Sequence, residues 1–319
     1  MNLDYNILWV DDNIEGLESL FDTHIKGQIE SLGFVMNLDI VGNEEELITI
    51  LNSTKNFNLI FMDYCFDDEN KGIRFIEEIR DKDIYCNIIF YSAQGIEELK
   101  KAINEYNLNG IYACYRQNIL RDIDKIKRMI QFDIMNNLDE SAMRGITMAQ
   151  VAEIDHILLE IVKDIPDNNK WNTIEKNAKN ARHKHCKKLI DKHENDEKKL
   201  ELLSKCQEVL SISDSDLKTI ILEDPEKSSR VFPTAARTEF LYGNEIFNQL
   251  MENYDKDSLI LFKKYKTDVI ELRNKLAHYK NPGEINYVEL RKNIILHKNN
   301  IIKIANYFRN ISENSVSNI

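Results

Sequence analysis

The sequence predicts an α/β domain with a five-stranded parallel sheet, followed by an all-α helical bundle. Short apolar runs alternate with amphipathic stretches over the first 137 residues, which is typical of a parallel sheet covered by helices on both faces. After about residue 138, apolar residues recur at helical spacing only. The first 137 residues also carry 13 Lys and Arg against 25 Asp and Glu, whereas the rest of the chain has 29 of each. Two regions of different chemistry are therefore expected to meet between residues 137 and 147.

Five runs in the first region have the length and composition of buried strands. They are Asn6–Val10, Phe34–Val41, Leu59–Met62, Asn87–Tyr91 and Ile111–Tyr115. Amphipathic stretches after these runs predict five helices. They are about Ile14–Leu32, Glu44–Leu51, Ile73–Arg80, Ile96–Tyr106 and a helix that begins near Ile119. Because a helix follows each strand, the strands are expected to run parallel in one sheet.

The second region is expected to form a bundle of about six helices. Its clearest element is a long helix over Leu259–His278, which Pro282-Gly283 separates from the last helix. Residues 236–319 are the predicted helical output domain. Residues 138–235 are either a connector or the first part of the same bundle, and the sequence leaves both open.

Composition excludes several classes of protein. The chain has 319 residues, 43% of them hydrophobic, and a net charge of −12, which indicates a globular protein. No stretch approaches the roughly 18 apolar residues of a membrane span, and the first residues do not resemble a signal peptide. The five cysteines include no Cys-x-x-Cys pair, so reduced thiols and no zinc site are expected. These features predict a cytoplasmic protein with no membrane partner.

Polar residues follow three of the predicted strands at the point where each strand ends. Asp11 and Asp12 follow the first strand, Asp63 follows the third, and Ser92 follows the fourth. Ligands gather at the carboxyl ends of parallel strands, so these side chains are expected in one crevice. Close carboxylates repel each other by roughly 4 kcal/mol per pair at an effective dielectric of 20, unless a cation lies between them. Oxygen ligands of this kind suit Mg²⁺.

These residues resemble the receiver domain of bacterial two-component response regulators. The resemblance covers about residues 4–137 and implies a flavodoxin-like fold. It rests on the acidic pair Asp11-Asp12, on Asp63 with Gly72 opening the next helix region, and on Ser92-Ala93 at the end of the fourth strand.

The receiver resemblance implies a phosphorylation site. Asp63 would accept a phosphoryl group from an upstream histidine kinase or phosphotransfer protein. Mg²⁺ would be held by Asp12, Asp63 and the backbone carbonyl of Cys65, with Asp11 in the same acidic cluster. Ser92 would then move to bind the phosphate.

The fifth strand departs from the receiver pattern. Receivers end this strand with lysine and proline, whereas this chain has Tyr115-Arg116-Gln117. Arg116 supplies the positive charge in one register, and Tyr115 takes its place if the register slips by one residue. Arginine is a planar fork and not a point charge, so it is not equivalent to lysine. The alternative is a receiver that has lost phosphotransfer and serves as a docking surface.

The sequence Arg273-Asn274-Lys275-Leu276-Ala277-His278 resembles the Arg-Asn-x-x-Ala-His motif of HEPN domains. These domains are helical bundles found in many prokaryotic toxins and defence proteins. The shorter pattern Arg-x4-6-His has a second match, Arg291 with His297. The first match differs from it by its extended form, with Asn274 next to the arginine and Ala277 before the histidine.

The HEPN resemblance implies a metal-independent endoribonuclease formed by a homodimer, with RNA as its substrate. RNA cleavage without metal requires an acid and a base for proton transfer and donors for the charged phosphorane. His278 would be the general acid or base, Arg273 the phosphate-binding cation, and Asn274 a positioning donor. A two-fold axis would bring both copies into one cleft. In the alternative interpretation, Arg273 and His278 are structural.

A basic stretch lies in the second region. Its members are Lys176, Lys179, Arg182, His183, Lys184, His185, Lys187, Lys188 and Lys192. It is either a solvated helix face or a contact for a nucleic-acid backbone such as DNA.

The sequence as a whole predicts a response regulator in which phosphorylation of Asp63 controls a dimeric HEPN-like ribonuclease, in stress response or antiviral defence. The alternative is a non-catalytic signalling adaptor whose helical domain dimerises or recruits a protein partner.

Overall fold

The computed structural model describes residues 3–14, 21–66, 72–93, 95–105, 110–136, 138–192, 203–204, 206–207, 210–224, 227–228, 231–277 and 285–316. The chain divides into two compact units. The first, the α/β unit, comprises Met1–Ile146 and Ile285–Lys292, and the second, the helical unit, comprises Thr147–Glu284 and Asn293–Ile319. The separate domain ranges 1–137, 138–235 and 236–319 stay predictions.

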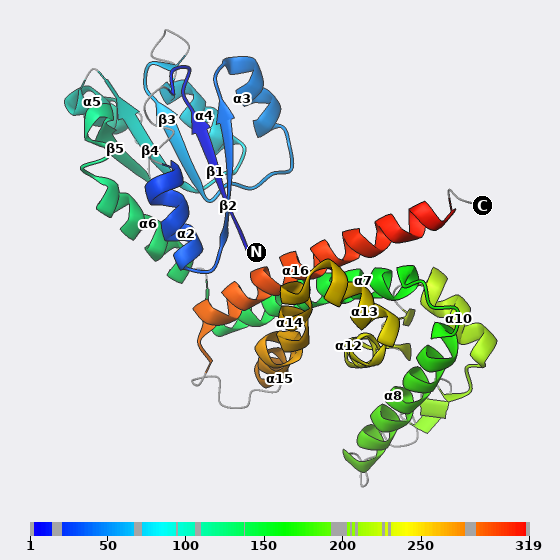
Figure 1. Ribbon diagram of the computed structural model, residues 1–319. Coiled ribbons are helices and arrows are strands. Elements are labelled where there is room, and N and C mark those ends of the chain that lie inside the picture. The colour runs from blue at the N-terminus through cyan, green and yellow to red at the C-terminus, as the bar shows by residue number, and fades with distance from the viewer. Residues whose placement is uncertain are drawn as a thin grey trace. The chain divides into compact units, whose positions relative to one another are not determined.

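A five-stranded parallel sheet forms the centre of the α/β unit (Figure 1). Its strands are β1 (Asp4–Val10), β2 (Val35–Val41), β3 (Leu59–Asp63), β4 (Asn87–Ser92) and β5 (Ile111–Tyr115). They lie in the order β2-β1-β3-β4-β5. This is the order of the flavodoxin-like fold, so the predicted fold class is confirmed for this unit.

Helices of the α/β unit pack on both faces of the sheet. They are the π-helical turn η1 (Phe21–Ile25), α2 (Lys26–Ser31), α3 (Glu44–Leu51), α4 (Gly72–Asp81), α5 (Ile96–Glu105), the 3-10 turn η3 (Arg116–Asn118) and α6 (Ile123–Asn136). Alternate strand residues point to opposite faces. Leu8, Ile60 and Phe90 belong to one buried cluster together with apolar residues of α3 and α4. Trp9 and Phe61 both contact Phe21 of η1, with ring centroids 4.2 and 4.9 Å apart, respectively.

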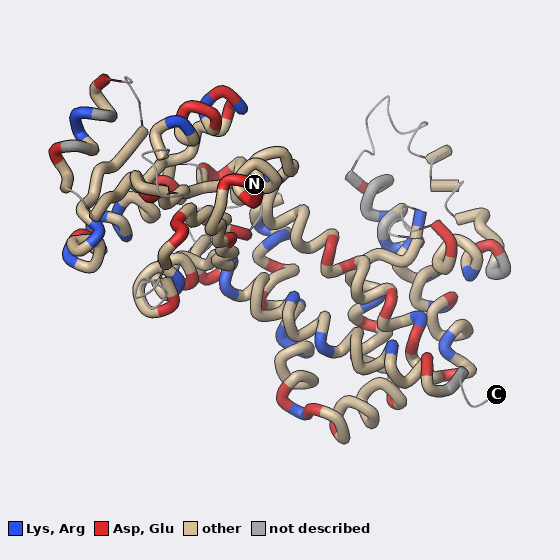
Figure 2. The backbone as a smooth tube through the Cα atoms, turned by 90° about the horizontal axis from the view of Figure 1, so that it is seen from above, with Lys and Arg blue, Asp and Glu red and all other residues tan. Residues whose placement is uncertain are grey.

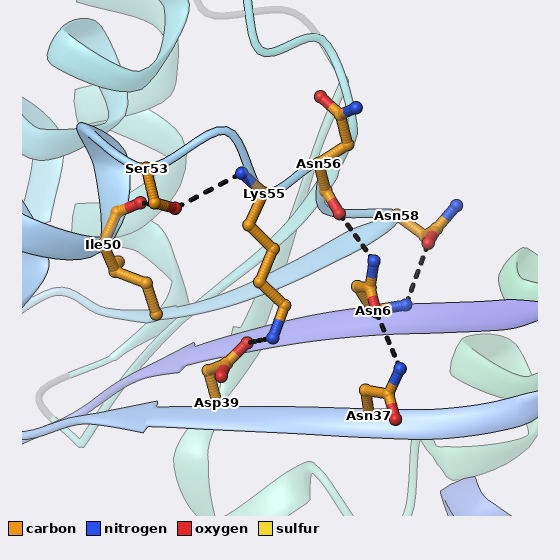
Figure 3. A network of polar contacts seen from close by, with 8 residues as sticks. All are labelled: Asn6, Asn37, Asp39, Ile50, Ser53, Lys55, Asn56 and Asn58. Atoms are coloured by element: carbon orange, nitrogen blue, oxygen red, sulfur yellow. Dashed lines mark hydrogen bonds and ion pairs between the residues drawn. The ribbon is translucent and has the colours of Figure 1, made fainter. Parts of the chain in front are cut away.

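Asparagine side chains tie three strands together near their amino ends (Figure 3). The backbone N–H of Asn6 in β1 donates to Asn58 Oδ1 at 2.9 Å, and its side-chain amide donates to the Asn56 carbonyl at 2.9 Å. Asn37 Nδ2 of β2 donates to Asn6 Oδ1 at 3.0 Å. This network fixes the register of β2, β1 and β3 at the edge of the sheet opposite to the acidic residues.

Gly33 allows a close approach in the α/β unit. Its φ is +78°, and a Cβ there would lie 2.8 Å from Cβ of Arg291. Arg291 belongs to the first turns of α16 (Tyr287–Val316), and its Nε and Nη2 donate to the Leu32 carbonyl at 3.0 and 2.7 Å. A side chain at position 33 would be strained in backbone conformation and would also push Arg291 away.

Helices make up most of the described residues of the helical unit. They are α7 (Glu140–Asp164), which begins in the α/β unit, α8 (Lys170–Lys192), α10 (Asp214–Glu223), α12 (Thr234–Gly243), α13 (Glu245–Tyr254), α14 (Lys256–Tyr265), the π-helical turn η4 (Lys266–Ile270), α15 (Glu271–Ala277) and the remainder of α16. The predicted helical fold class is thus confirmed for the second unit. Among the described residues, no helix is long and apolar enough to cross a membrane.

The apolar spacing from α12 to α14 resembles that of one continuous helix. Two polar N-cap residues nevertheless divide this stretch into separate helices. Asn244 accepts a hydrogen bond from the N–H of Phe247 and begins α13, and Asp255 accepts one from Ser258 and begins α14. Side chains of this type compete with the backbone and begin new helices. From Lys256 to Ala277 the helix then continues without interruption, which matches the long helix predicted there up to its last described residue.

Candidate functional site

Three carboxylates converge at the carboxyl ends of β1 and β3. Asp11 and Asp12 follow β1 directly, and Asp63 is the last residue of β3. Oxygen atoms of the three side chains lie within 4.8 Å of one another. Asp11 and Asp63 are 1% and 5% exposed, whereas Asp12 is exposed to solvent. The sequence prediction that these carboxylates share one crevice agrees with this geometry.

Local backbone geometry explains why Asp63 lies there. Val10 of β1 pairs with Met62 of β3, so the next residues in sequence, Asp11 and Asp63, are neighbours. Gly72 begins α4, and a Cβ at this position would lie 2.3 Å from the carbonyl oxygen of Asp63. Glycine is therefore required for α4 to pack this closely against the end of β3.

Burial and like charge both act on Asp63. Burial raises the pKa of its carboxyl to about 6, and the neighbouring charges of Asp11 and Asp12 act in the same direction. The positive charge of Arg116 and a hydrogen bond from the backbone of Cys65 lower this pKa in part. Among the described residues, the three carboxylates face the positive charge of Arg116.

Arg116 is the basic group beside the carboxylates. It follows β5, and its Nη1 lies 3.1 Å from Asp11 Oδ2 and 3.9 Å from Asp63 Oδ2. Its Nη2 also donates to the carbonyl of Asn13. Tyr115 is the last residue of β5, so of the two registers considered for this strand, the structure has the one that places Arg116 against the acidic residues.

Ser92 and Cys65 lie next to this cluster. Ser92 is the last residue of β4 and is fully buried, and its neighbour Tyr91 pairs with Asp63 across the sheet. The backbone of Cys65 donates to the Asp63 carboxylate. The roles of Ser92 as a phosphate switch and of the Cys65 carbonyl as a metal ligand stay predictions.

Sequence reasoning missed Tyr91. Its hydroxyl donates to Asp11 Oδ2 at 2.5 Å and accepts from Trp9 Nε1 at 2.6 Å. The available signal was a tyrosine directly before Ser92, at the end of an otherwise apolar run. In a strand buried on both faces, however, alternation does not reveal which aromatic residue turns its polar end to a site.

The acidic cluster fits a hard divalent cation. The three carboxylates could offer oxygen ligands that lie within 4.8 Å of one another, and Asp12 is open to solvent. The charges of Asp11 and Asp12 add to burial in raising the pKa of Asp63, and a bound cation would act in the opposite direction. Few protein oxygen ligands together with water suit Mg²⁺ better than a large cation such as Ca²⁺.

The second candidate site lies in the helical unit. Arg273 and Asn274 are neighbours on α15, and His278 lies outside the described residues. Arg273 is half-buried, and its Nε is buried without a hydrogen-bond partner, whereas Asn274 is exposed. The charge of Arg273 opposes the rise that burial causes in the pKa of Asp155 and of Tyr265. That Arg273, Asn274 and His278 lie together in one site stays a prediction.

The second match to the shorter Arg…His pattern has separate contacts at its two ends. Arg291 binds the Leu32 carbonyl within the α/β unit. His297 is fully buried within the helical unit, where its Nε2 lies 3.0 Å from Asp268 Oδ2. Both residues are thus explained by local structure.

The basic stretch lies on α8. Its exposed members are Lys176, Lys179, His183, Lys184 and Lys187. Arg182 is buried and donates to the Ala178 carbonyl at 3.3 Å, and the side chains of His185, Lys188 and Lys192 are not among those described. Positions of both charge signs are interspersed over the helical unit (Figure 2). Exposure of this kind suits a solvated face and a nucleic-acid contact alike, so both interpretations of the stretch stay predictions.

Comparisons of the chain with protein-family models, with curated proteins and with solved structures found no match.

Proposed function

We propose that the α/β unit is a receiver domain and that the protein is a two-component response regulator with Asp63 as its phosphoacceptor. The observation that carries this proposal is the arrangement around Asp63. A buried carboxylate at a strand end lies beside two further carboxylates and within 3.9 Å of Arg116. Burial and the like charges of Asp11 and Asp12 together raise the pKa of Asp63 to about 6, and a perturbed carboxyl group beside further carboxylates is typical of functional sites.

In the proposed reaction, a carboxylate oxygen of Asp63 attacks the phosphorus of a phosphohistidine on an upstream histidine kinase or phosphotransfer protein. The new oxygen–phosphorus bond forms while the phosphorus–nitrogen bond breaks, and the departing imidazole keeps the electron pair and takes up a proton. Above pH 6 most of the Asp63 carboxyl is ionised and able to attack. Mg²⁺ bound by Asp11, Asp12, Asp63 and the Cys65 carbonyl would balance charge on the phosphoryl oxygens. Arg116 adds a fixed positive charge with donors that match phosphate oxygens.

Acetyl phosphate with Mg²⁺ tests the phosphoacceptor. We expect intact-mass measurement to find one added phosphoryl group on the wild type and none on Asp63→Ala. Asp124→Ala, which changes an exposed carboxylate of α6 in the same unit, is the matched control and should be labelled as the wild type is. Labelling of Asp63→Ala, or no labelling of the wild type, would contradict the proposal and favour a docking surface.

We further propose that the helical unit is a HEPN-like output domain which cleaves RNA as a homodimer, in stress response or antiviral defence. Arg273 and Asn274 lie on a helix that continues from Lys256, so the motif has the rigid support that a catalytic site requires. His278 would act as general acid or base in a cleft shared by two copies. Phosphorylation of Asp63 would shift the population between dimer geometries, for which about 2.7 kcal/mol suffices to change activity a hundredfold.

One observation favours the alternative, a non-catalytic adaptor. Arg273 is half-buried, and its charge acts on Asp155 and Tyr265 in the interior of the helical unit. An arginine in this position can serve packing and charge balance alone. The helical unit would then dimerise or recruit a protein partner.

Cleavage of a labelled single-stranded RNA in EDTA separates the two functions. The nuclease predicts cleavage by the wild type that both His278→Ala and Arg273→Ala abolish, whereas Lys256→Ala, a change of an exposed lysine at the start of α14, retains it. Addition of Mg²⁺ and beryllofluoride should then change the rate only if Asp63 is intact. No cleavage under either condition would favour the adaptor and leave the receiver proposal standing.

A further inference from the structure

A chain of buried hydrogen bonds leads from the interior of the sheet to the acidic cluster. Trp9 Nε1 of β1 donates to the Tyr91 hydroxyl of β4 at 2.6 Å, and this hydroxyl donates to Asp11 Oδ2 at 2.5 Å. None of the three residues is more than 1% exposed. Water does not compete for these bonds, so the positions of the side chains determine one another.

Chemistry fixes the direction of these hydrogen bonds. An indole N–H can only donate, so the oxygen of Tyr91 must accept from Trp9. The remaining hydrogen of the Tyr91 hydroxyl therefore points to Asp11. Asp11 Oδ2 is therefore the acceptor of a hydrogen bond from Tyr91.

Asp11 is held from three sides. Besides Tyr91, the backbone N–H of Asn13 donates to its Oδ1 at 2.8 Å, and Arg116 Nη1 lies 3.1 Å from its Oδ2. Only Tyr91 among these groups is uncharged, fully buried and tied to a further buried donor, Trp9. Tyr91 is therefore an uncharged side-chain donor that orients Oδ2 of Asp11.

We propose that Tyr91 is a positioning residue which sets the cation affinity of the acidic cluster through its hydrogen bond to Asp11. This inference rests on the Mg²⁺ site of the proposed function and extends it to a residue outside the ligand set. Groups that orient metal ligands contribute typically 10–100-fold to metal affinity. We expect Tyr91→Phe to weaken Mg²⁺ binding about tenfold, since the ring still fills its place while the donor to Asp11 is lost.

The experiment measures the Mg²⁺ dissociation constant of the full chain by calorimetry. Tyr5→Phe is the matched control, because Tyr5 is also a buried strand tyrosine of this unit whose hydroxyl binds an aspartate, Asp133, at 3.2 Å. Tyr5→Phe should leave the affinity within about twofold of the wild type, well below the effect of losing a group that orients a metal ligand. Equal effects of the two substitutions would overturn the inference, because the change would then reflect a general loss of packing.

A double substitution tests the route through Asp11. In an Asp11→Asn background, Tyr91→Phe should no longer alter Mg²⁺ affinity, because the group it orients has lost its charge. An undiminished effect in that background would overturn the inference. If Tyr91→Phe does not fold, Trp9→Phe replaces it: this change removes the donor to Tyr91 and should weaken Mg²⁺ binding in the same direction, and an unchanged affinity overturns the inference.

Failure of the two proposals gives different results. Absence of Mg²⁺ and Mn²⁺ binding by the wild type would overturn the cation site and this inference together. Binding by the wild type that Tyr91→Phe leaves unchanged would overturn this inference alone.

Discussion

Buried carboxylates are paired with basic groups differently in the two units. In the α/β unit, Asp11 and Asp63 are buried beside Asp12, and Arg116 is the one basic group with ion pairs to them among the described residues. In the helical unit, Asp155 and Arg237 are buried at 7% and 1% exposure and form one pair, with 2.9 Å between Oδ2 and Nη1.

This difference distinguishes a candidate ligand-binding site from a structural ion pair. Arg237 also donates to the Asp155 carbonyl at 2.8 Å and to the Ser228 hydroxyl at 3.0 Å, so most of its donors are used within the unit. In this pair one carboxylate faces one guanidinium, whereas in the acidic cluster three carboxylates face Arg116 among the described residues. An excess of one charge sign beside buried groups favours a ligand of the opposite charge.

Breaking the balanced pair should have the largest effect. Arg237→Met leaves the Asp155 carboxylate buried without its partner, which is expected to destabilise the helical unit by about 3–5 kcal/mol at neutral pH. The loss should shrink as the pH falls, because burial already raises the pKa of Asp155 and protonation removes the unpaired charge. Urea unfolding followed by Trp171 fluorescence, in a Trp9→Phe background, measures the helical unit selectively.

Lys298→Met is the control for that substitution. Lys298 pairs with Glu153 in the same unit, but the side chains are 27% and 52% exposed, so a loss of less than about 1 kcal/mol is expected. Equal losses for the two variants would mean that the Asp155–Arg237 pair is no more important than a surface pair.

Removing one negative charge from the acidic cluster should instead increase the free energy of unfolding. The folded-state pKa of Asp63 is about 6 against an ordinary value of 3.8, so the folded state binds its proton more tightly. The stability from this proton is fully present below pH 3.8 and is lost as the pH rises through 6. Asp63→Asn should therefore stabilise the α/β unit by about 2–3 kcal/mol at pH 7.5 in EDTA.

Trp9 fluorescence in a Trp171→Phe background follows unfolding of the α/β unit and measures this gain. The gain should disappear near pH 4, where the wild-type carboxyl is protonated. Added Mg²⁺ should reduce it as well, because a bound cation stabilises the wild-type carboxylate. A gain that is independent of pH would mean that repulsion at Asp63 is not its cause.

Much of the α/β unit could be predicted from the sequence because its signals are local. Ile111–Tyr115 was predicted with the observed bounds, and the other strands lie within two residues of their predicted ends. Apolar runs of four to eight residues between helical stretches leave little choice of strand position. Asp11, Asp12 and Asp63 could be found by the same reasoning, since parallel strands bring their carboxyl ends to one edge.

The missed features depend on contacts between distant residues. The Tyr91–Asp11 bond joins residues 80 apart, and the Asp155–Arg237 pair joins residues 82 apart. No local pattern distinguishes a buried Arg237 from a solvated arginine on α12. The π-helical turn at Lys266–Ile270 likewise has no signal in the apolar spacing, which continues through it.

A smaller effect is expected from Arg116, which pairs with the acidic cluster. Arg116→Met removes a cation that lies 3.1 Å from Asp11 and 3.9 Å from Asp63, so Mg²⁺ should bind more tightly. A gain of about tenfold, or about 1.4 kcal/mol, is expected from the removed repulsion. Calorimetry with Mg²⁺ measures it, and Arg121→Met, which changes an exposed arginine of the same unit, should have no such effect. Weaker binding by Arg116→Met would mean that this residue organises the cluster more than it competes with the cation.

The smallest effect is expected at His297, a buried side chain of the helical unit that can be neutral. Burial lowers the pKa of His297 below its ordinary 6.5, although Asp268 acts in the opposite direction. The folded state therefore keeps His297 neutral while the unfolded state takes up a proton below pH 6.5. Stability of the helical unit should fall as the pH drops from there, by at most about 1.4 kcal/mol per pH unit.

His297→Gln removes this titration and keeps an amide that can donate to Asp268. Its unfolding free energy, measured in urea by Trp171 fluorescence, should depend less on pH between 6.5 and 5 than that of the wild type. His183→Gln, a change of an exposed histidine on α8, should retain the wild-type slope. Identical slopes for His297→Gln and the wild type would mean that His297 and Asp268 form a charged pair in the fold. The helical unit would then contain a second balanced ion pair, and the contrast with the uncompensated carboxylates of the α/β unit would be sharper still.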